Sequence, residues 1–289
     1  MSIAIISLLS GLAGMFGWGI YDFFAGIYSK KIGPYKTFFW SQLAGLFFVL
    51  LLISVFTFTL NIPAWIIFLL PIAALFYSAG YLLFMKGFEI GNISIVAAIM
   101  NLWAVFTMLI AFIFMGQRLS ALQSIGVLMI ISGAVLASLN WSDLKNKRFQ
   151  LSSGVKETVL GAFFFGVFWN ISEVISEKIG WLLTTLFVKI GIILFLLLLS
   201  FLIKRELCLT KASPKTKLMV VLMGIIEAGA VAIVNFGLTI GDAILITPIA
   251  SALSVVTITM AVIFLKDNIT KLQGFGIITA ISGIIATGF

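Results

Sequence analysis

Long apolar runs fill almost the whole chain, and short polar or glycine-containing interruptions separate them. A helix needs about 20 mostly apolar residues to cross the hydrocarbon core of a bilayer, and the runs have about that length. They lack the alternation of polar and apolar residues that marks the strands of an outer-membrane barrel. We therefore predict an all-α membrane protein with ten transmembrane helices, at residues 3–28, 35–59, 65–88, 91–115, 120–139, 155–179, 181–203, 217–239, 243–265 and 270–288.

The second half of the chain repeats the first at a constant offset of 150 residues. Identical residues at that offset include Gly87/Gly237, Ile99/Ile249, Thr107/Thr257, Phe114/Phe264, Gln123/Gln273, Gly126/Gly276, Ser132/Ser282 and Gly133/Gly283. Each half holds five spans, and a repeat with an odd number of spans must enter the bilayer upside down in its second copy. We predict two inverted five-helix repeats, 1–140 and 154–289, joined by a cytoplasmic linker at 141–153. Alternating-access carriers are commonly built in this way.

A motif closes each half: Phe114-Met115-Gly116-Gln117-Arg118-Leu119-Ser120-Ala121-Leu122-Gln123-Ser124-Ile125-Gly126 in the first and Phe264-Leu265-Lys266-Asp267-Asn268-Ile269-Thr270-Lys271-Leu272-Gln273-Gly274-Phe275-Gly276 in the second. This motif resembles the signature of EamA-type members of the drug/metabolite transporter superfamily. Trp18-Gly19 and Pro248 also resemble family positions. The resemblance covers nearly the whole chain. It implies a ten-helix carrier of small metabolites, with a central cavity lined by the first four helices of each half.

Two features depart from the family pattern. The acidic residue that usually follows the Leu-Gly pair is Gln117 in the first copy and Asp267 in the second, and the proline expected in the fourth span is Ala98. A gating role for the family's glutamate is therefore not carried over to Gln117.

The composition agrees with a lipid environment, because 62% of the 289 residues are hydrophobic and only 10% are charged. Soluble domains are nearer 45–50% apolar and about 25% charged. The N-terminus has no basic segment before its first apolar run, so we interpret that run as a span and not as a removable signal.

The net charge of +8 could indicate nucleic-acid binding, but the distribution of the basic residues favours a membrane surface. If the N-terminus starts outside, fifteen of the 18 basic residues fall in cytoplasmic loops and two in outer loops. This asymmetry predicts that both termini lie outside the inner (plasma) membrane. Anionic lipid headgroups are expected partners of the cytoplasmic lysines, and nucleic acid is not.

The sequence has one cysteine, Cys208, and no histidine. A disulfide framework is therefore impossible, and neither a metal nor a cofactor is expected. The motifs G-x-S-x-G and H-E-x-x-H and the phosphate-binding loop are absent, and Tyr21-Asp22 with Gly241-Asp242 resembles an intramembrane aspartyl protease only faintly. We do not expect an enzyme.

Four charged residues, Asp22, Glu173, Lys189 and Glu227, lie away from the ends of predicted spans, where an ionisable side chain costs roughly 2.5–3.5 kcal/mol and needs a reason to be present. Glu227 is predicted either to form a buried ion pair with Lys189 that serves assembly, or to be a cavity carboxylate that binds a cation or exchanges a proton. Glu173 is predicted in the cavity or at a water-exposed mouth. Asp22 is either functional or an interface residue beside Lys30 and Lys31.

Aromatic and polar residues at mid-span positions complete the predicted site. Tryptophans often mark the membrane interface, so Trp18 and Trp169 line either the cavity or that interface. Pro248 leaves a backbone carbonyl without its helical partner, which a substrate could use. The predicted substrate-binding residues are Trp18, Tyr21, Asp22, Tyr77, Tyr81, Asn101, Trp169, Asn170, Glu173, Glu227, Thr247, Pro248 and Ser251.

Three carboxylates against one deep lysine favour a cationic, zwitterionic or neutral solute, such as an amino acid or amine. We predict a secondary transporter working by alternating access, with proton-coupled export as one option. A lipid flippase or a non-transporting sensor on the same fold is the alternative. The glycine stripes Gly126/Gly133 and Gly276/Gly283 indicate close helix packing within a monomer or the seam of a homodimer.

Overall fold

A computed structural model describes residues 3–58, 60–90, 99–138, 154–210, 212–266 and 270–287, and every regular element in these ranges is helical. The helices are α1 Ile3–Ile32, α2 Pro34–Val55, α3 Ala64–Ile90, α5 Leu102–Phe114, α6 Ala121–Ser138, α8 Val155–Ile179, α9 Trp181–Leu202, α10 Pro214–Leu238, α11 Ala243–Ser251, α12 Leu253–Met260, the π-helical turn η1 Ala261–Leu265, and α13 Lys271–Thr287. Among the described residues, seven spans are long and apolar enough to cross a membrane, and α5, α6 and α13 are shorter apolar helices. The prediction of an all-α membrane protein with ten spans is confirmed.

Local signals that hydropathy cannot register shift several helix ends. The predicted span 35–59 ends at Val55, because Phe56 takes an extended backbone conformation. The first helix continues past residue 28 to Ile32. The eighth begins at Pro214 and not at 217, because the Ser213 side chain accepts a hydrogen bond from the Thr216 backbone N–H and proline suits the first helical turn.

The ninth predicted span, 243–265, is interrupted and not one continuous helix. It divides at Ala252, next to Ser251, into α11, α12 and η1. Ser251 is equivalent to Asn101 of the first repeat, and Asn101 lies in a turn before α5. Pro248 lies inside α11 and lacks the backbone donor that would support an unbroken helix. An interrupted helix within a span is typical of carrier folds.

The motif that closes each repeat begins a helix with a capping box. Ser120 Oγ accepts from the Gln123 backbone N–H at 3.2 Å, and Gln123 Oε1 accepts from the Ser120 backbone N–H at 3.0 Å. Thr270 and Gln273 make the same two bonds at 3.2 and 2.9 Å. These reciprocal bonds satisfy backbone donors that every helix start leaves free. The repeated Gln123/Gln273 pair therefore has a structural role.

The helices that these boxes begin, α6 and α13, pack against each other through the glycine stripes. A side-chain carbon added at Gly126 would lie 2.8 Å from the Gly283 carbonyl, and one added at Gly276 would lie 2.7 Å from the Gly133 carbonyl. The first glycine of one helix thus meets the second glycine of the other, so the two helices are antiparallel. Because α6 and α13 are equivalent, this crossing shows that the repeats are inverted. The stripes therefore allow α6 and α13 to pack closely within one chain.

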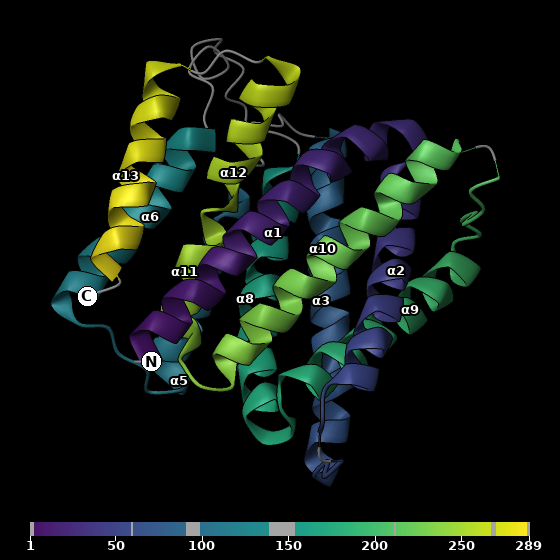
Figure 1. The fold of residues 1–289 in the computed structure, drawn as a ribbon, viewed down its shortest axis with the longest axis horizontal. Helices are drawn as coiled ribbons and strands as arrows, with labels where there is room; N and C mark the ends of the chain where they lie inside the picture. The colour runs from purple at the N-terminus through teal and green to yellow at the C-terminus, as the bar shows by residue number, and fades with distance from the viewer. Residues whose placement is uncertain are drawn as a thin grey trace.

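The remaining contacts follow the same pseudo-twofold relation. Helix α3 packs on α8 as α10 packs on α1, and α2 packs on α10 as α9 packs on α3. Figure 1 shows α6 and α13 side by side at one end of the bundle, with both chain termini on the same edge. The main buried core lies between the two repeats and draws on α1, α2, α3, α5, α8, α9, α10 and α11.

Candidate functional site

A buried ion pair lies where the two repeats meet. Lys189 Nζ on α9 is 2.6 Å from Glu227 Oε2 on α10, and it also donates to Gln42 Oε1 on α2 at 2.9 Å. Tyr77 on α3 donates its hydroxyl to Glu227 Oε1 at 2.7 Å. Both carboxylate oxygens of Glu227 are therefore occupied, and its charge is balanced. These two bonds leave one Lys189 N–H, and Gln42 Nε2 has no hydrogen-bond partner in the described structure.

A chain of hydroxyl groups runs beside the ion pair. Tyr81 donates to the Tyr21 hydroxyl at 3.1 Å, Tyr21 is 3.1 Å from Ser41 Oγ, and Ser41 donates to the Phe38 carbonyl at 2.9 Å. Because Ser41 uses its proton on that carbonyl, the proton between Tyr21 and Ser41 belongs to Tyr21. The Phe38 ring stacks on Tyr81 with centroids 3.9 Å apart and also stacks against Tyr77. This ring joins the hydroxyl chain to the ion pair.

Three tryptophans from three helices form an adjoining aromatic cluster. The Trp18 ring on α1 lies 5.1 Å from Trp169 on α8 and 6.2 Å from Trp103 on α5, centroid to centroid. All three side chains are buried, which places Trp18 and Trp169 inside the bundle. Phe168 contacts both Trp169 and Tyr77, so the aromatic surface is continuous with the ion-pair region.

Glu173 has a different setting from the one that the sequence suggested. It is fully buried, so it does not occupy a water-exposed mouth in this structure. Its Oε1 accepts from Gln117 Nε2 at 2.7 Å and from the Ala243 backbone N–H at 3.1 Å. Gln117 Oε1 in turn accepts from the Ile244 backbone N–H at 3.1 Å. These two side chains cap the N-terminus of α11, where free backbone donors favour a carboxylate.

The smaller polar residues of the predicted site bond mainly to backbone. Asn170 Nδ2 donates to the carbonyls of Thr107 and Gly166, at 3.1 and 2.8 Å. Thr247 and Ser251 donate to carbonyls of their own helix, Ala243 and Pro248. Asn101 is buried at the start of α5. Ala98 and Asp267, the two remaining departures from the family pattern, and the linker 141–153 lie outside the described residues.

Asp22 stands apart from the other two carboxylates within the bundle. It lies on α1 one turn after Trp18, keeps part of its surface accessible although protein surrounds it, and acts electrostatically on Tyr21, Tyr77 and Tyr81. No cation or hydrogen-bond donor contacts its carboxylate among the described residues. Lys31, one of its expected neighbours, lies over the Tyr28 ring instead.

Sequence reasoning missed several residues that the structure brings into this region. Gln42, Ser41 and Trp103 all contact predicted site residues. Asn235 accepts from Ser172 and donates to Thr185, both at 2.9 Å, which links α8, α9 and α10. Each is a polar or tryptophan residue inside an apolar span, and that signal could have identified them.

The described residues form pockets away from this centre. One of about 330 Å³ lies between the α2–α3 connection and the α8–α9 turn, and Asn61, Lys178 and Trp181 help to line it. Another, of about 710 Å³, lies at the C-terminal end of α9. No predicted substrate-binding residue lines either pocket. Among the described residues, no three His, Cys, Asp or Glu side chains gather closely enough to hold a metal ion.

Comparisons with known proteins agree with the repeat architecture. The sequence profile of the EamA-like transporter family matches residues 5–139 and 152–289, one match for each repeat. No curated protein matches the sequence. One solved crystal structure, described only as that of a protein, superimposes with a TM-score of 0.74, covering 97% of this chain and 94% of the other at 18% identity. That likeness shows a shared fold. The two profile matches together span nearly the whole sequence, and the chain therefore belongs to the EamA-like transporter family.

Proposed function

We propose that this protein is a secondary transporter that moves a small cationic, zwitterionic or neutral metabolite, such as an amino acid or amine, across the cell membrane. The family and the inverted repeats support transport by alternating access, in which the two repeats rearrange around a shared central site. The proposed membrane is the inner (plasma) membrane with both termini outside, as the distribution of basic residues favours.

The observation that carries the choice of substrate is the unpaired carboxylate of Asp22. Glu227 is neutralised by Lys189, and Glu173 accepts two hydrogen bonds. Both Glu173 bonds use Oε1, and its buried Oε2 has no partner. Asp22 differs from both glutamates, because neither of its oxygens has an ion-pair or hydrogen-bond partner among the described residues. An ionised group inside a membrane protein is strongly favoured to pair, and a protonated amine supplies both the charge and the hydrogen bonds.

The surroundings of Asp22 favour the same class of solute. Trp18 lies one helical turn away, and an indole face attracts a cation with about 0.5–2 kcal/mol. The tyrosine hydroxyl chain next to Asp22 offers polar groups for a carboxylate or amide of the same solute. A phosphorylated anion would require clustered Arg and Lys, whereas the one buried cation of the described bundle, Lys189, is bound to Glu227 and Gln42.

The same carboxylate offers a route to proton coupling. Asp22 can hold either a proton or the amine of the substrate, and one group cannot hold both. Competition between the two at a site that opens alternately to each side would couple export of the solute to entry of a proton. This proposal needs no further ionisable group.

A thermal-shift experiment on purified protein tests the proposal. The wild type, Asp22→Asn and Asp242→Asn would be screened against amino acids, amines, neutral metabolites and sugar phosphates. A bound solute raises the unfolding temperature by mass action. We expect at least one amine-containing compound to stabilise the wild type and Asp242→Asn, an equivalent change at an exposed helix start, but not Asp22→Asn. Stabilisation by sugar phosphates alone, or of Asp22→Asn as strongly as wild type, would contradict it. Movement of fluorescent lipids in place of solutes would favour a flippase.

A further inference from the structure

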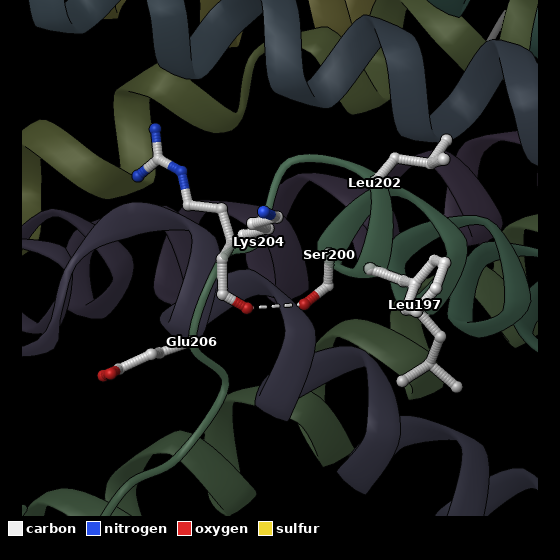
Figure 2. A pocket seen from close by; sticks show the side chains of 7 residues that line it. Leu197, Ser200, Leu202, Lys204 and Glu206 are labelled. Carbon is white, nitrogen blue, oxygen red and sulfur yellow. Dashed lines mark hydrogen bonds between the residues drawn. The ribbon is translucent and has the colours of Figure 1, made fainter.

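The C-terminal end of α9 combines exposed apolar side chains with two basic ones. Its pocket of about 710 Å³ is lined by Leu197, Ser200, Phe201, Leu202, Lys204, Arg205 and Glu206. Phe201 is 81% exposed and Leu202 is 65% exposed, at the last turn of a transmembrane helix. In Figure 2, Leu197 and Leu202 lie on one side of Ser200, and Lys204 and Glu206 lie on its other side. The pocket therefore has an apolar side and a charged side.

The backbone at this helix end is fixed by hydrogen bonds. The Arg205 backbone N–H donates to the Ser200 carbonyl at 3.0 Å, and Ser200 Oγ donates to the Arg205 carbonyl at 2.6 Å. Lys204 lies between them with a φ of 51°. That left-handed conformation is the usual place for glycine after a helix, because any side-chain carbon disfavours it. Lysine therefore stands where glycine would suit the backbone better, and it is a lining residue of the pocket.

The charge of the pocket is positive. Glu206 Oε2 lies 3.8 Å from Lys36 Nζ on α2, so its charge is offset from outside the pocket. Lys204 and Arg205 contact no carboxylate among the described residues. The two basic groups also follow a helix C-terminus, where cations are favourable in general, so a purely structural role is the competing explanation.

Two aromatic residues of α2 place this region at the depth of lipid headgroups. The Tyr35 hydroxyl donates to the Leu196 carbonyl and Trp40 Nε1 donates to the Leu207 carbonyl, both at 2.6 Å. Tyrosine and tryptophan with their polar ends bonded in this way are typical of the membrane–water interface. The bonds also hold the end of α9 and the following loop against α2.

We propose that this pocket binds one anionic phospholipid, with its headgroup phosphate on Lys204 and Arg205 and its acyl chains along Leu197, Phe201 and Leu202. A free phosphate would use the basic side alone and would leave the exposed apolar side without a role. The site is separate from the central cluster, and the proposal does not depend on the transported solute. It would make the stability of the α9 end sensitive to the lipid composition of the membrane.

The test compares two lysine-to-glycine variants in detergent. Lys204→Gly removes the charge and suits the positive φ, so the variant should fold. Lys266→Gly is the matched control, because Lys266 also has a positive φ, of 57°, follows exposed apolar residues and does not line the pocket. Unfolding temperature would be measured against added phosphatidylglycerol, phosphatidylcholine or inorganic phosphate.

We expect phosphatidylglycerol to raise the unfolding temperature of the wild type and of Lys266→Gly by several degrees, and Lys204→Gly to lose at least half of that rise. Phosphatidylcholine and inorganic phosphate should have little effect on any of the three. An equal response of both variants would show that Lys204 and Arg205 only complete the helix end. A response to inorganic phosphate as large as that to the lipid would also overturn the proposal.

Discussion

Tyr77 and Glu227 occupy equivalent positions of the two repeats, and they hydrogen-bond to each other, from the tyrosine hydroxyl to Glu227 Oε1 at 2.7 Å. Equivalent residues of two inverted repeats can meet only at the axis that relates the repeats. The ion pair of Glu227 with Lys189 therefore lies at the junction of the two halves. Any movement of one repeat relative to the other would therefore change the contacts at this junction.

The ion pair can be tested for a structural role by removing its members singly and together. Glu227→Gln leaves Lys189 buried without its counter-charge, and breaking such a pair costs about 3–5 kcal/mol. Lys189→Met combined with Glu227→Gln removes both charges and should recover most of that loss. Thermal unfolding of the two single variants and the double variant in one detergent measures the difference.

A double variant that stays as unstable as Glu227→Gln would show that the carboxylate supports the fold through Tyr77 and not through Lys189. The Tyr77→Phe variant separates these contributions. It removes one charged hydrogen bond, which contributes about 1.5–3 kcal/mol.

Glu173 is expected to act as a helix cap. Glu173→Gln keeps an oxygen that can accept from the Ala243 N–H, so its free energy of unfolding should change by less than about 1 kcal/mol. Glu173→Ala leaves the buried Ala243 N–H without a partner, at a cost of about 1–3 kcal/mol, and also removes the acceptor of the half-buried Gln117 amide. Chemical unfolding followed by tryptophan fluorescence checks whether Glu173→Ala loses more stability than Glu173→Gln. Equal losses for both variants would mean that the negative charge, and not the acceptor oxygen, stabilises α11.

Two glycines on α13 should respond oppositely to the same substitution. A side-chain carbon at Gly276 would lie 2.5 Å from the Ala137 backbone nitrogen on α6, whereas nothing lies within 4 Å of one at Gly274. Gly276→Ala should therefore destabilise the protein by about 1–3 kcal/mol through overpacking. Gly274→Ala should be neutral or stabilising by up to about 1 kcal/mol, because alanine favours helix. Thermal unfolding of the pair distinguishes this packing from a seam between two chains, where Gly276→Ala would leave the isolated monomer unaffected.

Architecture could be predicted from the sequence because it depends on patterns that extend over many residues. Five apolar runs per half and matched residues such as Gln123/Gln273 were enough to indicate inverted repeats. The break at Ala252 was not predicted, because its flanking residues are as apolar as a continuous helix. Hydropathy also could not show that Ser213 begins α10 or that Phe56 ends α2, since those signals are single backbone hydrogen bonds and dihedral angles.

The site was harder to predict because its chemistry depends on which residues meet across helices. Position within a span identified Glu227, Glu173 and Asp22 as unusual but could not show that two of them are already bonded. The Gln42 contact with Lys189 joins residues 147 apart in the sequence. Only the three-dimensional arrangement shows that Asp22 makes no ion pair or hydrogen bond with the described residues.

Membrane orientation can be read from the cysteine that the chain already carries. Hydrogen bonding to Thr210 lowers the pKa of the exposed Cys208 thiol below its usual value, which favours reaction with maleimide at neutral pH. We expect an impermeant maleimide to label Cys208 only from the cytoplasmic side. Ile3→Cys in a Cys208→Ser background should be labelled only from the outer side. Labelling of both positions from one side would contradict the topology.

Solute counterflow in proteoliposomes tests the central claim most directly. Vesicles loaded with a mixture of unlabelled amino acids and amines would be placed in trace amounts of the isotopically labelled compounds, without ATP, and uptake followed by mass spectrometry. The account predicts transient accumulation of at least one labelled amine-containing compound by the wild type and by Asp242→Asn, and none by Asp22→Asn. Equal accumulation by Asp22→Asn, or none by folded wild-type protein, would contradict it.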